Sequence, residues 1–128
     1  MSNHEPTAPA DLSQLLARDY WLVLSTPGAD VGRAAIEEHV QAHVAWLLDL
    51  EQAGVLFLSG PLLSGPGVGP GSGVTVLRAD DEDAARLIAA GDPFVLAGLR
   101  TFEVYAWRLN EGSVCVRMSL GTGTYEWR

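Results

Sequence analysis

The segment RAAIEEHVQAHVAWLLDLEQA, residues 33–53, decides the fold of this chain. At about 100° per residue, one side of a helix collects five apolar residues: Ile36, Val40, Val44, Leu47 and Leu50. Acidic and amide side chains occupy the opposite side. His43 breaks this division because it projects into the apolar stripe. A titratable imidazole that faces the interior needs a hydrogen-bond partner or a chemical role, so His43 is the first candidate functional residue.

Apolar runs on both sides of this helix predict β-strands. The acidic run at residues 80–83 favours the start of a second helix, with Asp80 as its N-cap, and Gly91 ends that helix. The turn at residues 110–112 predicts that the last strand pairs back as a hairpin with the strand before it. The expected strands are residues 20–25, 55–59, 74–79, 101–109 and 114–120.

The resulting order predicts an α+β fold of the ferredoxin-like βαββαβ type, with an extra C-terminal strand. Both helices of such a fold cover one face of the sheet, which leaves apolar strand residues on the other face. We expect that face to pair with a second copy, giving a homodimer or a higher homo-oligomer. Residues 1–19 are expected to form an N-terminal tail and lead-in, residues 20–120 the domain, and residues 121–128 a C-terminal tail.

Composition excludes several classes of function. The 128 residues carry a formal net charge of −8, which argues against nucleic acid and against an anionic membrane surface as partners. No apolar run approaches membrane-spanning length, and the N-terminal residues lack a signal-peptide pattern, so we expect a cytoplasmic protein. All eight basic residues are arginines, and the absence of lysine excludes lysine-bound pyridoxal phosphate and a P-loop. No cofactor is expected. The single cysteine, Cys115, is expected to be a buried, unreactive thiol.

His39 and Asp92 extend the list of candidate residues. His39 lies one turn before His43 in the pattern H-x-x-x-H, but no third ligand is near, so no metal site is expected. Asp92 precedes Pro93, a pair that serves as an N-cap with a first-turn proline. Alternatively, its carboxylate reaches an imidazole and fixes its tautomer. Spacing does not decide between these interpretations, nor between a core and a functional role for His43.

Other residues are candidates for holding a small molecule. Arg33, Arg78, Arg100 and Arg108 either suit an anionic group or are surface residues. Trp46 and Trp107 either line a pocket or pack in the core. The glycine-rich loop at residues 60–73 matches no dinucleotide-binding motif. It is either a flexible connector or a mobile rim over a pocket.

Two segments resemble the YCII-related (YciI-like) family. They are AHVAWLLDLEQAGVLFLSGPL at residues 42–62 and GDPFVLAGL at residues 91–99. The run AWRLNEGSV at residues 106–114 resembles the extended C-terminal form of many members. The similarity spans roughly residues 20–120. It implies a dimeric α+β barrel built from ferredoxin-like subunits, and a catalytic pair that falls on His43 and Asp92.

The resemblance also implies a reaction class, because related barrels include isomerases and a dehydrochlorinase that move protons on small oxygenated rings. We therefore expect a cofactor-independent isomerase or lyase in which Asp92 orients His43, and His43 acts as general base and then acid. Arg33, His39, Trp46 and Arg100 are the residues expected to bind the substrate. The alternative is a non-catalytic small-molecule-binding or accessory protein with the same fold. A third hypothesis is a dimerisation module whose tail, with Tyr125 and Trp127, docks on a partner chain.

Overall fold

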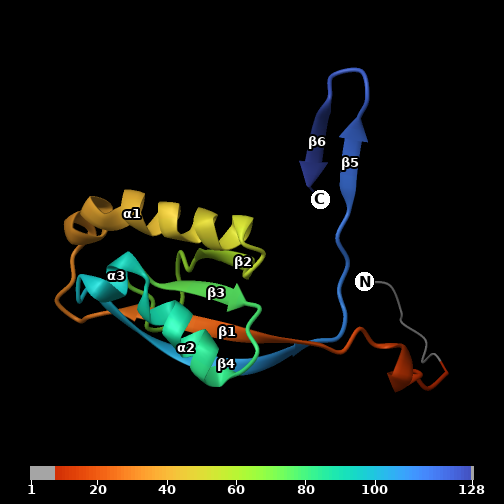
Figure 1. Ribbon diagram of the computed structural model, residues 1–128, viewed down its shortest axis with the longest axis horizontal. Coiled ribbons are helices and arrows are strands. Elements are labelled where there is room, and N and C mark those ends of the chain that lie inside the picture. Colours follow the sequence, from red (N-terminus) through yellow and green to blue (C-terminus); the bar gives the residue numbers. More distant parts are fainter. Residues whose placement is uncertain (1–7, 128) are drawn as a thin grey trace. The chain divides into compact units, whose positions relative to one another are not determined.

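Four strands form one sheet in the order β2-β3-β1-β4 in the computed structural model, which describes residues 8–127 (Figure 1). Part of the predicted N-terminal tail and residue 128 of the predicted C-terminal tail lie outside the described residues. The helices are a short 3₁₀ turn at Leu12–Gln14, α1 Arg33–Gln52, α2 Glu82–Ala90 and α3 Pro93–Leu96. The strands are β1 Arg18–Pro27, β2 Leu56–Pro61, β3 Gly73–Leu77, β4 Arg100–Leu109, β5 Val116–Ser119 and β6 Thr124–Trp127.

Strand β3 runs antiparallel to both of its neighbours, β1 and β2. Its register pairs Val23 of β1 with Thr75, and Trp21 with Leu77. Because side chains alternate along a strand, these residues share one face of the sheet. The predicted α+β fold with an antiparallel sheet is confirmed.

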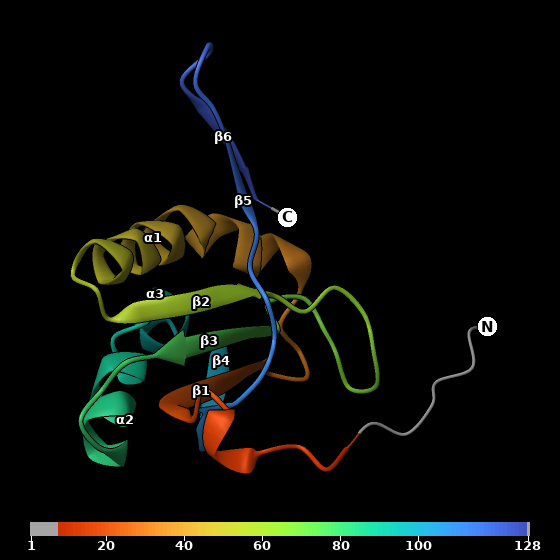
Figure 2. The ribbon, with the colours of Figure 1, turned by 90° about the vertical axis from the view of Figure 1, so that its right-hand side faces the viewer.

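The hydrophobic core lies between that face and the helices. Leu77 is fully buried at its centre, and α2 contributes Ala85 and Ala89. Leu50 of α1 packs against the same cluster, so both long helices cover one face of the sheet (Figure 2). The other core members, Val23 and Val104, come from β1 and β4.

Helix α1 occupies almost the predicted range and runs beside β2 (Figure 2). Its apolar stripe lines a cavity together with residues of β2. Ile36 is buried, but Val40 and Val44 are 38% and 42% exposed. The stripe therefore serves two purposes. Its C-terminal part, with Leu50, packs on the core, whereas its middle part borders a cavity.

The two shorter helices follow local capping chemistry. The carboxylate of Asp81, rather than the predicted Asp80, accepts a hydrogen bond from the Ala84 N–H and caps α2. Asp92 caps α3 in the same way, and Pro93 occupies the first helical position, where its missing N–H costs nothing. Helix α3 contacts α1, which brings Asp92 beneath the middle of that helix.

The C-terminal segment departs from the prediction. Residues 116–119 do not pair back on β4; they pair with Thr124–Trp127 in a separate two-stranded sheet. Pairing with β6 closes a shorter loop than pairing with β4 would, since only four residues separate β5 from β6. Gly123 adopts the φ of +66° that the tight turn requires. Cys115 is exposed, so the prediction of a buried thiol is wrong.

The contacts within the chain define two compact units. One comprises residues 19–108 and holds the four-stranded sheet; the other comprises, among the described residues, 8–18 together with 109–127. The predicted domain, residues 20–120, thus extends beyond the sheet-bearing unit at its C-terminal end. Among residues 8–127, no helix combines the length and the apolar character needed to cross a bilayer.

We expect Leu77→Ala to lower the free energy of unfolding by about 2–5 kcal/mol, because it leaves a cavity in a fully buried site. The matched control is Leu87→Ala on α2, where the side chain is 78% exposed, and its effect should stay within about 0.5 kcal/mol. Urea denaturation measures both. Equal effects of the two substitutions would contradict this assignment of the core.

Candidate functional site

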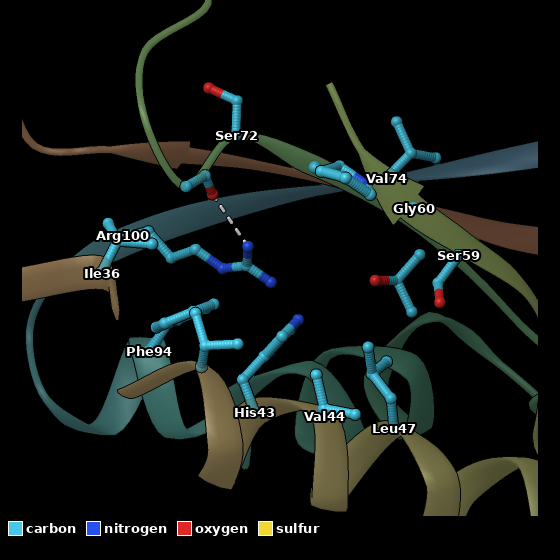
Figure 3. A pocket seen from close by; sticks show the side chains of 15 residues that line it. Ile36, His43, Val44, Leu47, Ser59, Gly60, Ser72, Val74, Phe94 and Arg100 are labelled. Carbon is cyan, nitrogen blue, oxygen red and sulfur yellow. Dashed lines mark hydrogen bonds between the residues drawn. The ribbon is translucent and has the colours of Figure 1, made fainter. Parts of the chain in front are cut away.

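A cavity of about 400 Å³ opens between α1 and the strands β2 and β3 (Figure 3). Its walls are mostly apolar, and two side-chain hydroxyls, from Ser59 and Thr75, face it from the strands. The residues before β3, from the end of the glycine-rich loop, form its rim. The α1 residues that line it are Ile36, Val40, His43, Val44 and Leu47.

His43 projects from the middle of α1 into this cavity (Figure 3). Its side chain is 14% exposed, and its Nδ1 lies 2.8 Å from Oδ1 of Asp92. The imidazole stacks on the ring of Phe94, with 4.4 Å between ring centroids. His43 is therefore neither bonded to the backbone nor loosely packed. Its orientation is fixed by a carboxylate on one side and an aromatic ring on the other.

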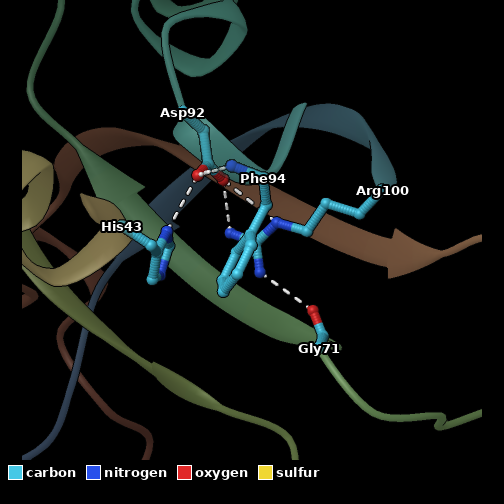
Figure 4. A network of polar contacts seen from close by, with 5 residues as sticks. All are labelled: His43, Gly71, Asp92, Phe94 and Arg100. Carbon is cyan, nitrogen blue, oxygen red and sulfur yellow. Dashed lines mark hydrogen bonds and ion pairs between the residues drawn. The ribbon is translucent and has the colours of Figure 1, made fainter. Parts of the chain in front are cut away.

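Asp92 is the common partner of three groups (Figure 4). Its Oδ1 accepts hydrogen bonds from His43 and, at 3.0 Å, from the backbone N–H of Phe94. Its Oδ2 accepts from Nε of Arg100 at 3.0 Å and from the terminal Nη2 of Arg100 at 2.6 Å. The side chain of Asp92 is both an N-cap and an imidazole partner, so the two interpretations of Asp92-Pro93 are compatible.

The surroundings keep the Asp92 carboxyl ionised. Burial acts to raise its pKa, because it disfavours charge. The hydrogen bond to His43, the charge of Arg100 and the Phe94 N–H outweigh burial, and they hold the pKa of Asp92 below its ordinary range. At neutral pH the carboxylate can only accept hydrogen bonds.

This ionisation determines the tautomer of His43. An ionised Asp92 requires that Nδ1 carry a proton, so the neutral imidazole keeps its lone pair on Nε2. Among residues 8–127, no group forms a hydrogen bond with Nε2. Nε2 of His43 is thus a basic nitrogen at the cavity, and the negative charge of Asp92 lies next to the other ring nitrogen, Nδ1.

Arg100 is buried at the wall of the cavity, and the nitrogens of its guanidinium bind other groups of the chain. Two nitrogens bind Asp92, and Nη1 donates to the carbonyl oxygen of Gly71 at 2.9 Å (Figure 4). The guanidinium carbon also lies 4.9 Å from the centroid of the Phe94 ring, in cation–π geometry.

The remaining predicted substrate-binding residues lie outside the cavity lining. Arg33 is exposed at the start of α1. His39 lies 3.1 Å, through Nδ1, from the carbonyl oxygen of Ala35. The ring centroid of Trp46 is 5.9 Å from that of His43, on the side of a small internal void rather than of the cavity. Only Arg100 of the four lines the cavity, and the binding role of each stays a prediction.

Sequence reasoning missed Phe94, Ser59 and Gly71. Phe94 stands in the D-P-F triplet quoted for the family resemblance, so its position was visible but its contact with His43 was not. Ser59 and Gly71 gave no signal, because one lies in an ordinary strand and the other in a loop rich in glycine. The part of the chain that the structure describes contains no cluster of three His, Cys, Asp or Glu side chains suited to a metal.

Comparison with known families identifies the chain's family. The YCII-related domain model matches residues 20–108, which is more than half of the sequence. The chain belongs to the YCII family. Curated protein sequences, in contrast, give no significant match to this YCII protein.

Among solved structures, this YCII protein is similar to 5-chloro-2-hydroxyhydroquinone dehydrochlorinase from Burkholderia phenoliruptrix AC1100, in complex with 2,5-dihydroxybenzoquinone. The TM-score is 0.57 and the sequence identity 22%, and the match covers 69% of this chain and 92% of the dehydrochlorinase. At this identity, the similarity shows a shared fold.

The lowered pKa of Asp92 makes stability depend on pH. Its charged form is favoured in the folded state, so its stabilising contribution is complete above the unfolded pKa of about 3.9 and is lost as the pH falls through the lower folded value. We expect Asp92→Asn to be less stable than wild type by about 3 kcal/mol at pH 7, because it leaves Arg100 buried without a countercharge. The difference should shrink below about pH 4.

Denaturation at a series of pH values tests this dependence. Asp81→Asn is the control, because asparagine caps a helix about as well as aspartate and Asp81 is exposed. A gap between wild type and Asp92→Asn that stays constant down to about pH 2 would contradict the ionised state assigned to Asp92.

Proposed function

We propose that this YCII protein is a cofactor-independent enzyme that transfers a proton on a small oxygenated molecule, with His43 as general base and acid. The observation that carries the proposal is the 2.8 Å contact between Nδ1 of His43 and the buried carboxylate of Asp92 at the wall of a cavity. An imidazole is suited to this role, because its ordinary pKa lies close to neutral pH.

The proposed chemistry starts at Nε2. Its lone pair takes a proton from a C–H or O–H bond of the substrate, and the electron pair of that bond remains on the substrate. The ionised Asp92 stabilises the imidazolium that forms, without taking its proton. In an isomerisation His43 returns the proton to another atom of the substrate. In an elimination the electron pair forms a double bond, and a group such as chloride departs with its own pair.

The size and lining of the cavity support a small ring as substrate. A volume of about 400 Å³ accommodates one substituted ring, and apolar walls with a few hydroxyl and backbone groups suit an oxygenated one. The dehydrochlorinase of similar fold binds 2,5-dihydroxybenzoquinone, a compound of this class. Arg33, His39 and Trp46 remain proposed substrate-binding residues from outside the cavity lining. Arg100, the fourth predicted residue, lies at the cavity wall, but its donors are bound to Asp92 and Gly71.

A second candidate function is non-catalytic binding of a small molecule. It is favoured by the exposed apolar side chains that line the cavity, among which Val40 and Val44 are 38% and 42% exposed. In this case the His43–Asp92 pair would orient a ligand rather than exchange a proton with it.

We also propose that the chain is a ferredoxin-like subunit and that two copies pack sheet to sheet as a dimeric α+β barrel. The face of the sheet away from the helices carries apolar residues. Leu58 pairs with Val76 on this face, and the alternation along β4 places Tyr105 there. Leu58 and Tyr105 are 43% and 47% exposed in a single chain.

We propose the cytoplasm as the location, on the grounds of the sequence alone.

Activity assays on His43 variants test the enzymatic proposal. A panel of chlorinated and unchlorinated hydroxyquinols and unsaturated lactones is incubated with wild type, and chloride release and ¹H NMR report elimination and isomerisation. We expect His43→Gln to lower turnover by about 10²–10⁴-fold, because it removes the base. The control is Glu38→Gln on the exposed side of the same helix, which should keep near wild-type turnover, since Glu38 is exposed and does not line the cavity.

Unchanged turnover in His43→Gln would refute the catalytic role. Binding of 2,5-dihydroxybenzoquinone by a protein that converts no member of the panel would support the binding function instead.

The oligomer proposal is tested by sedimentation. Wild type should sediment at twice the mass of the chain, and Leu58→Glu should dissociate it, because a carboxylate would be buried between the two sheets. Leu87→Glu is the control on the helical side, where the side chain is 78% exposed. A monomeric wild type, or a Leu58→Glu dimer as tight as wild type, would contradict the barrel.

A further inference from the structure

We propose that Arg100 is a positioning residue that fixes the Asp92 carboxylate for His43 and also fastens the glycine-rich loop to the rim of the cavity. The inference rests on the proposed role of His43 for its functional meaning. That Arg100 fixes both the His43 imidazole, through Asp92, and the loop at the cavity rim can be tested without a substrate.

The two oxygens of the Asp92 carboxylate bind different partners. Both Arg100 donors that reach Asp92, at 3.0 and 2.6 Å, bind the same oxygen, Oδ2. Oδ1 is left for His43 and for the N–H of Phe94. A carboxylate held at one oxygen by two donors of a rigid fork cannot rotate without breaking charge-assisted bonds. Arg100 therefore decides which oxygen faces the imidazole.

Arg100 also contacts the glycine-rich loop. Nη1 of Arg100 donates to the carbonyl oxygen of Gly71 at 2.9 Å, two residues before β3 begins. Gly71 has a φ of +90°, and a Cβ at this position would lie 2.5 Å from Cδ1 of Ile36. The loop backbone thus passes closely over α1, where only glycine fits, and Arg100 ties it there. Gly71, Ile36 and Arg100 all line the cavity.

These contacts occupy all three nitrogens of the Arg100 guanidinium. Arg100 is 6% exposed and packs over the ring of Phe94, which also stacks on His43. A substrate anion would have to displace Asp92 or Gly71 to use the same donors. Arg100 consequently acts through Asp92 and the loop, rather than by direct contact with a reacting group.

The test compares wild type with Arg100→Lys and Arg100→Met in the absence of any ligand. Lysine keeps the charge but has no planar fork, and methionine keeps the length of the chain but has no donor. The control is Arg78→Met. Arg78 also donates to backbone carbonyls, those of Gly54 and Leu56, and packs on an aromatic ring, but it contacts no carboxylate of the site.

Two signals are read by NMR. The ¹⁵N shifts of the His43 ring give the fraction of the Nδ1–H tautomer, and amide exchange of Leu62, whose N–H donates to the Ser72 carbonyl, reports the loop. In both Arg100 variants we expect the minor tautomer to rise severalfold and Leu62 exchange to accelerate by about tenfold or more. Arg78→Met should leave both signals as in wild type.

The proposal is overturned if both signals in the Arg100 variants match wild type, if only one of them changes, or if Arg78→Met changes them equally. Should Arg100→Met fail to fold, Arg100→Lys gives the answer alone. Because neither signal involves turnover, an inactive wild type would count against the proposed enzymatic function and not against this role of Arg100.

Discussion

The site depends on one buried carboxylate that is shared between two cationic or potentially cationic groups. Asp92 is 2% exposed, and an isolated charge in that position would be strongly disfavoured. Arg100 and the backbone N–H of Phe94 compensate the charge, so the carboxylate stays ionised and still has one oxygen for His43. Asp92 is also the N-cap of helix α3. The start of that helix therefore fixes the position of the carboxylate that binds the His43 imidazole.

The fold brings these groups together from segments far apart in the sequence. His43 comes from α1, Asp92 and Phe94 from the start of α3, and Arg100 from the first residue of β4. Because α1 lies over β2 and β3, its apolar stripe and the strands enclose a cavity, and His43 presents the titratable side chain within it. The cavity wall and the acid/base pair are therefore parts of one packed unit.

Local patterns predicted the elements of the sheet-bearing unit. The 3.6-residue period located α1, and the Asp92-Pro93 pair located a helix start. The prediction failed where two pairings competed, since periodicity cannot say whether residues 116–119 pair with β4 or with a later segment. Site residues such as Ser59 and Gly71 were invisible for a related reason. Their importance comes from tertiary contacts, and neither residue type is unusual in a strand or a loop. The family resemblance, rather than spacing, directed attention to His43 and Asp92 together.

The central claim is that Asp92 is ionised and that His43 carries its proton on Nδ1, with the Nε2 lone pair toward the cavity. Neutron diffraction from a deuterated crystal grown near neutral pH observes these positions directly. We expect a deuteron on Nδ1 of His43 and none on either oxygen of Asp92. A deuteron on the Asp92 carboxyl, or an Nδ1 without one, would contradict it.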